Sequence, residues 1–128
     1  MTQARKKSEL TPEERVLYLE AYFAAVDTLI VAQSKLSQLE RITSDLGARS
    51  RYRADGLRIE ADIELLRARR IAFNADDARV NPPSQETVDR AIAMAKDVAN
   101  EQVDRNRAEA IVKFATKAMT EFSNIHKG

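Results

Sequence analysis

Glycine and proline are so rare in this chain that long, uninterrupted helices are the main structure open to it. The 128 residues contain three of each. Tight turns depend on the φ angles that these two residues supply, so their scarcity argues against a loop-rich enzyme scaffold or a β fold with many short turns. The only breaks of this kind are Pro12, Gly47, Gly56, Pro82, Pro83 and Gly128. The chain is therefore predicted to be all-α.

Capping signals mark the start of a first helix. Thr11 suits the N-cap, Pro12 the first helical position, and Glu14 completes a Thr-x-x-Glu capping box. The helix is expected to end at Leu46, before Gly47. Apolar residues recur through it at alternating spacings of four and three, as in a coiled coil: Tyr18, Tyr22, Ala25, Leu29, Ala32, Leu36, Leu39, Thr43 and Leu46. A second stripe occupies only its first half and predicts burial there on two faces: Val16, Leu19, Phe23, Val26 and Ile30.

Residues 50–75 are predicted to form a second helix with two opposed apolar faces. One face carries Tyr52, Ile59, Ile63, Leu66 and Phe73. The opposite face carries Ala54, Ala61, Leu65, Ala68, Ala72 and Ala75. A helix that is apolar on two sides is expected to lie between two neighbours. We therefore expect this helix to be the central one.

The third helix begins after Pro83, with Ser84 as its N-cap. Residues 100–109 are almost wholly polar, which leaves two interpretations open. Charged residues at steps of four favour one continuous helix over residues 84–123, because opposite charges at that spacing attract by about 0.2–0.5 kcal/mol per pair. Alternatively, Asn106 and Glu109 start a fourth helix. We favour the continuous helix.

Together these patterns predict an all-α, elongated, antiparallel three-helix bundle with long, coiled-coil-like helices, or four helices if the third breaks near Asn106. Residues 1–10 are expected to be a flexible basic N-terminal tail. Residues 11–128 are expected to form a single helical domain, with helices at about 12–46, 50–75 and 84–123.

Composition removes most kinds of catalytic site from consideration. The chain has no cysteine, its one histidine is His126, and three glycines are too few for a phosphate-binding loop. We therefore predict no metal, no cofactor and no enzyme activity. Carboxylate pairs could bind Mg²⁺ or act as acid and base. The candidates, Asp76 with Asp77 and Glu60 with Glu64, have charged neighbours and are interpreted as solvated surface.

Arginines gather near the turn between the first two helices. Arg49, Arg51, Arg53 and Arg58 could grip phosphates, with Tyr52 available for base stacking. The net charge is nevertheless only +1 and acidic residues are interleaved with the arginines. A nucleic-acid-binding module that uses these arginines is therefore the alternative function. No segment reads as a leader or a membrane span, and we expect a cytoplasmic protein.

The last part of the chain carries an apolar stripe that two antiparallel neighbours would not cover. We will call it the C-terminal stripe: Ile111, Phe114, Ala115, Ala118, Phe122 and Ile125. Such a stripe seldom stays exposed. It therefore either folds back as a fourth helix or docks on another chain, and we favour docking, most simply in a homodimer built on Phe114, Ala118 and Phe122. The predicted function is a non-enzymatic helical interaction protein (adaptor, chaperone or regulator) that acts through protein–protein contacts.

Overall fold

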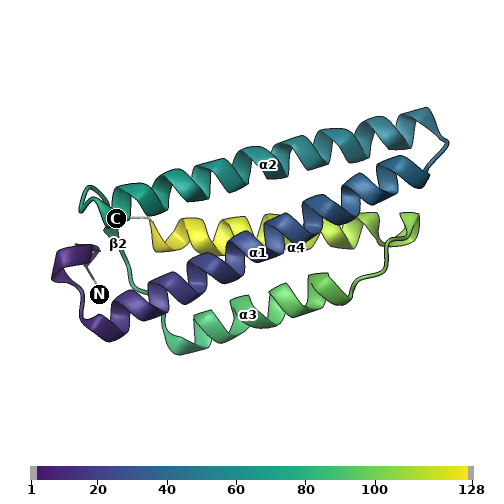
Figure 1. Cartoon of the computed structure of the whole chain (residues 1–128). Helices are drawn as coiled ribbons and strands as arrows, with labels where there is room; N and C mark the ends of the chain where they lie inside the picture. Colours follow the sequence, from purple (N-terminus) through teal and green to yellow (C-terminus); the bar gives the residue numbers. More distant parts are fainter. Residues whose placement is uncertain (1–2, 127–128) are drawn as a thin grey trace.

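The computed structural model describes residues 3–126, which form a bundle of four α-helices (Figure 1). The helices are α1 (Pro12–Ile42), α2 (Leu46–Asn74), α3 (Gln85–Asn100) and α4 (Ala108–Ile125). The shorter elements are the strands β1 (Arg5–Lys6) and β2 (Arg79–Val80) and the 3₁₀ turns η1 (Lys7–Glu9) and η2 (Arg105–Arg107). Successive helices run in opposite directions, so the architecture is an elongated up-and-down bundle.

The central helix is α1. It packs against all three other helices, with α2 and α3 on opposite sides of it and α4 behind it in Figure 1. Its predicted core row is buried from Tyr18 to Leu39, and Thr43 is buried as well, whereas Leu46 is exposed. On α2 the predicted inner face, from Tyr52 to Phe73, is buried. The prediction that the second helix is the central one is wrong, because its other face is open to solvent.

The start of α1 is as predicted, but the turn to α2 is not. The Glu14 backbone N–H donates to Thr11 Oγ1 (3.2 Å), and the Thr11 N–H donates to Glu14 Oε1 (2.9 Å). At the other end, α1 stops at Ile42 and Asp45 caps α2 by accepting a hydrogen bond from the Gly47 N–H (3.1 Å). The first backbone N–H groups of a helix have no acceptor within the helix, and an Asp side chain can accept from them whereas a glycine has no side chain to do so. Gly47, expected to end α1, therefore lies in the first turn of α2.

The third predicted helix is two helices, so the three-helix count is wrong and the four-helix alternative is correct. After Asn100 the chain is extended as far as Asp104, and it turns through η2 into α4. The Lys35 ammonium of α1 donates to the carbonyls of Ala99 and Glu101, which secures the open end of α3. Charge pairs along a continuous helix are worth only tenths of a kcal/mol each. Burial of the apolar face of α4 against α1 outweighs them.

The segment expected to be a flexible tail is part of the fold from Arg5 onward. β1 pairs with β2 in an antiparallel register, with Arg5 opposite Val80. The Ser8 backbone N–H and hydroxyl both donate to the Asp76 carboxylate, at 3.0 and 2.9 Å. Leu10 is only 4% exposed. This small clasp joins the N-terminal residues to the loop between α2 and α3.

Candidate interaction surfaces

The C-terminal stripe is mostly core, not surface. Ile111, Ala115, Ala118, Phe122 and Ile125 are buried within the chain, and Phe114 is half-buried. The Phe122 ring lies 5.6 Å from that of Tyr18 and 5.8 Å from that of Tyr22, centroid to centroid. The break after α3 lets α4 fold back along α1, which supplies the cover that a continuous helix would have lacked. Of the three residues predicted to build an interface, Ala118 and Phe122 are therefore core residues, and Phe114 is partly exposed at a hollow along α4.

The histidine at the end of α4 belongs to an aromatic cluster. The Tyr18 hydroxyl and His126 Nε2 are 2.7 Å apart, and the Tyr18 ring stacks on Phe73 at 3.9 Å. Burial, with a smaller contribution from Arg69, lowers the pKa of His126 to about 4. Burial also raises the pKa of the Tyr18 hydroxyl. Both side chains are thus neutral near pH 7, and their hydrogen bond ties the end of α4 to α1.

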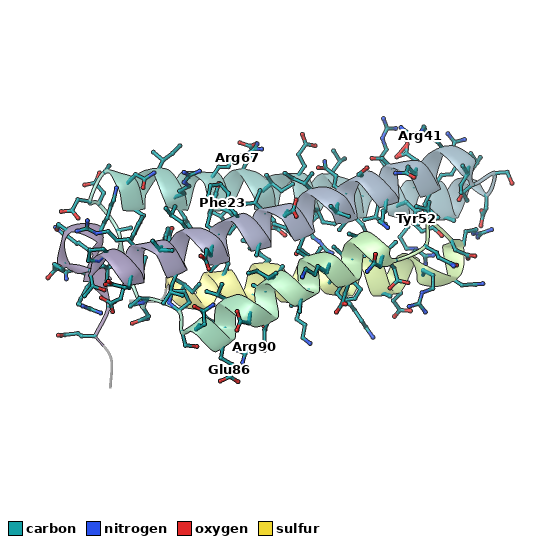
Figure 2. The ribbon with its side chains drawn as sticks, turned by 60° about the horizontal axis from the view of Figure 1, so that its bottom comes forward. Phe23, Arg41, Tyr52, Arg67, Glu86 and Arg90 are labelled. Atoms are coloured by element: carbon teal, nitrogen blue, oxygen red, sulfur yellow. The ribbon has the colours of Figure 1, made fainter. Side chains whose placement is uncertain are left out.

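The four predicted phosphate-binding arginines all lie in the first half of α2 and are exposed, but Arg49 and Arg53 lie on one side of the helix and Arg51 and Arg58 on the other. Tyr52, whose position at this end of the bundle is seen in Figure 2, is 3% exposed and so is not available for stacking on a base. The Arg51 guanidinium lies 5.8 Å from its ring centroid. The burial of Tyr52 confirms its predicted place on an apolar face of the second helix.

The α3–α4 loop brings further charges to the same end, which the sequence spacing did not suggest. Arg105 pairs with Asp45 of the α1–α2 turn (3.5 Å), and Arg107 pairs with Glu101 (2.5 Å). A cleft of about 510 Å³ between α2 and this loop is lined by Arg51 and Arg105 but also by Asp55 and Glu109. Positive and negative charges therefore balance in this cleft.

One carboxylate of each predicted pair has a structural partner. Asp76, at a positive φ of 62°, accepts the two bonds from Ser8, which lower its pKa. Glu64 pairs with Arg67 on the same helix (2.9 Å). Within residues 3–126 no three His, Cys, Asp or Glu side chains are grouped so that they could hold a metal ion. The pocket between α1, α3 and α4 measures about 10 Å³, which is room for one water.

Since α1 has neighbours on three sides, its exposed residues form a single narrow strip. From residue 13 to residue 41 every exposed position follows the last by three or four, and we call this the α1 strip: Glu13, Val16, Glu20, Phe23, Asp27, Ile30, Ser34, Ser37 and Arg41. Acidic and apolar residues alternate through its first half. Val16, Phe23 and Ile30 are 52%, 54% and 42% exposed, so three of the five residues of the predicted second stripe are surface.

A shallow groove runs beside this strip, between α1 and α3. Its α1 wall includes Phe23, Asp27 and Ile30. Its α3 wall includes Ile92, which is 37% exposed, and Lys96. Across the strip from α3, the Arg70 guanidinium of α2 lies 4.9 Å from the Phe23 ring centroid and bounds the apolar surface. We call this feature the α1–α3 groove.

The second open apolar surface is the face of α2 that points away from the bundle. We call it the α2 outer stripe: Ala54, Leu57, Ala61, Leu65, Ala68, Ile71 and Ala75. All seven residues are exposed, and Leu57 and Ile71 are 60% and 69% exposed. The sequence analysis found the alanines and Leu65 of this face but expected another helix to cover them.

Among the helices of residues 3–126, α1 alone is long and apolar enough to cross a membrane. Half of its most apolar segment, however, is buried inside the bundle. The core helix of a bundle passes the same test, so this feature carries no assignment.

Comparison with known proteins adds no function, since no family model, no curated protein and no solved structure matches this chain. The exposed surfaces are therefore the features of this chain that point to a function.

Proposed function

We propose that this chain is a non-enzymatic interaction protein that binds a helical segment of another protein in the α1–α3 groove. The observation that carries the proposal is the alternation of apolar and acidic residues along the first half of the α1 strip. Isolated exposed apolar residues are ordinary, but a contiguous row of them is typical of a contact surface. An amphipathic helix laid in a groove contacts its host through apolar side chains at spacings of three and four.

The charges beside the groove define the chemistry of the partner. Glu13, Glu20 and Asp27 form an acidic row that recurs every seven residues, next to the apolar row of Val16, Phe23 and Ile30. A partner helix with an apolar face and a line of Lys or Arg along one edge would complement both rows. Complementary charge at the edge of an interface contributes mostly to specificity and to the rate of association.

Binding of two designed peptides tests the proposal. One is an amphipathic Leu/Lys helix, and the other is its Leu/Glu counterpart with the same apolar face. We expect the chain to bind the basic peptide at least about tenfold more tightly than the acidic one, as measured by fluorescence anisotropy. Phe23→Asp should abolish the binding, and Glu20→Lys with Asp27→Lys should reverse the preference.

A matched control uses the end of the same strip. Ser37→Asp places the same new charge on α1 beyond the apolar half, and it should leave the affinity unchanged. Equal binding of both peptides, or binding that survives Phe23→Asp, would contradict the proposal. Circular dichroism of each variant verifies that the helices are intact, since the substituted side chains are exposed and their replacement should not unfold the chain.

A further inference from the structure

The α2 outer stripe has the spacing of a helix-pairing surface. Ala54, Ala61, Ala68 and Ala75 recur every seven residues, and Leu57 and Ile71 follow them at the intervening three-residue step. Residues with this repeat lie along one side of a helix and form the seam of a two-stranded coiled coil. Within the described chain α3 lies on the far side of α1, so no other helix covers this face.

We propose that the α2 outer stripe binds the same stripe of a second copy of this chain, with the two α2 helices antiparallel. The seam has two kinds of position, the row of alanines and the row that contains Leu57 and Ile71. In the antiparallel arrangement a position of one row lies opposite a position of the other row on the second copy, so large and small side chains face each other. Leu57 faces Ala68 of the second copy, and Ile71 faces its Ala54. Two-fold symmetry repeats both contacts, so the two large residues of the seam, Leu57 and Ile71, each meet an alanine. The self-association expected from the sequence is thus placed on α2, because α4 is used inside the bundle.

Charges beside the stripe select the same register. Glu60 and Arg67 flank the seam on one side, and in this register each Glu60 lies opposite Arg67 of the second copy. Shifting the pairing by one heptad in either direction instead brings Glu60 against Glu60, or Arg67 against Arg67. Figure 2 shows Arg67 at the outer edge of α2, where its side chain is accessible. Of these three registers, only the one with Glu60 opposite Arg67 has opposite charges facing each other along this side of the seam.

A parallel pairing is disfavoured by other charged residues of α2. It would place Glu64 against Glu64 in the seam and Arg53 beside Arg58 of the second copy. Like charges in these positions are a common means of rejecting a wrong orientation. In the antiparallel register Glu64 lies opposite Ala61 instead, where there is room for its carboxylate to keep the ion pair with Arg67.

The pairing leaves the α1–α3 groove free on both copies. α2 and α3 lie on opposite sides of α1, so a contact made by the outer face of α2 does not reach α3 (Figure 1). The resulting dimer presents two grooves. This inference does not depend on what the groove binds.

Sedimentation of the wild type and of two variants tests the contact. The wild type should sediment as a reversible dimer. Leu57→Asp with Ile71→Asp should weaken the association by at least about a hundredfold and leave a folded monomer, since both side chains are exposed in the monomer. The matched control Phe23→Asp puts the same charge on the α1 strip and should not change the mass. A wild type that is monomeric throughout would overturn the proposal.

Charge reversal tests the register. Glu60→Arg alone and Arg67→Glu alone should each weaken the dimer by about tenfold, and the double variant should recover most of that loss, because the pair is restored with its signs exchanged. Losses that simply add in the double variant would rule out this contact. Glu64→Ala removes the one charge in the seam and should tighten the dimer.

Disulfide trapping tests the orientation, in a chain that has no cysteine of its own. Leu57→Cys and Ala68→Cys are prepared as separate proteins. In the antiparallel dimer these positions face each other, so oxidation of the mixture should give a mixed disulfide and oxidation of either protein alone should not. Efficient crosslinking of each protein with itself would show a parallel pair and overturn the proposed geometry.

Discussion

α2 and α4 both carry apolar residues at helical spacing beyond what one neighbour covers, yet one stripe is buried and the other is open. On α4 the C-terminal stripe packs on α1, and on α2 the outer stripe has only solvent beside it. The difference lies in the size of the side chains. Phe122, Ile111 and Ile125 bring a large apolar area to α4, whereas alanines make up most of the α2 outer stripe. Folding buries the stripe that gains most from leaving water.

The largest expected effect comes from placing a charge on each stripe. Phe122→Asp should unfold the chain, because an unpaired carboxylate in the core costs several kcal/mol, comparable to the whole stability of a small domain. Ile71→Asp should change the free energy of unfolding by less than about 0.5 kcal/mol when the chain is kept dilute. Thermal melts followed by circular dichroism measure both. Similar melting temperatures for the two variants would show that the distinction between the stripes is wrong.

Two adjacent leucines sharpen the comparison within α2. Leu66 is fully buried on the inner face, and Leu65, in the α2 outer stripe, is 43% exposed. Leu66→Ala should cost about 2–5 kcal/mol, since it leaves a cavity against α1. Leu65→Ala should cost less than about 1 kcal/mol. Urea unfolding of both proteins provides the values, and equal losses would mean that α2 is covered on both faces.

The sequence predicted the parts of this bundle that depend on neighbouring residues in the chain. The capping box of Thr11 and Glu14, the buried row of α1 and the inner face of α2 are all local patterns, and the structure confirms them. The turn at Asp45 carried a local signal as well, since Asp is a strong N-cap. The presence of Gly47 two residues later led to the wrong boundary.

The remaining features depend on residues far apart in the sequence, and periodicity does not reveal such contacts. Lys35 holds the end of α3 from another helix, and Ser8 reaches Asp76 across the molecule. The central position of α1 results from its packing against α2, α3 and α4 at once, which are contacts between distant parts of the sequence. Two opposed apolar faces on α2 were a sound reason to expect two neighbours, but within residues 3–126 only one of the two faces is covered. The candidate surfaces were therefore found only after the packing was known.

A smaller effect is expected from the His126 contact that secures α4. Its pKa is about 4 in the folded chain and about 6.5 when unfolded. The unfolded state therefore binds more protons between these values. The contribution of His126 to the free energy of unfolding is therefore fully present above about pH 6.5 and is lost as the pH falls toward 4. After allowing for the partial exposure of the ring, this loss is on the order of 2 kcal/mol.

His126→Gln isolates this contribution, because glutamine can hydrogen-bond to the Tyr18 hydroxyl but does not titrate. Urea unfolding of both proteins at several pH values between 7.5 and 4 should show a steeper loss of stability for the wild type. Other groups are common to both proteins, including Asp62, whose pKa is raised by burial and which acts in the opposite direction. Parallel curves would mean that His126 is not held neutral against Tyr18.

The smallest expected effect is at the arginine end of the bundle, where the nucleic-acid alternative can be decided. Arg49→Glu with Arg53→Glu should leave the binding of short single-stranded and duplex DNA undetectable, as in the wild type, in gel shifts at about 150 mM salt. Acidic residues at this end of the bundle neutralise much of its positive charge. Tyr52, the ring predicted to stack on a base, is buried. Arg90→Glu on α3, labelled at the lower edge of Figure 2 and away from Tyr52, is the control. Sub-micromolar binding by the wild type that Arg90→Glu retains and the double variant loses would make this end, and not the α1–α3 groove, the functional surface.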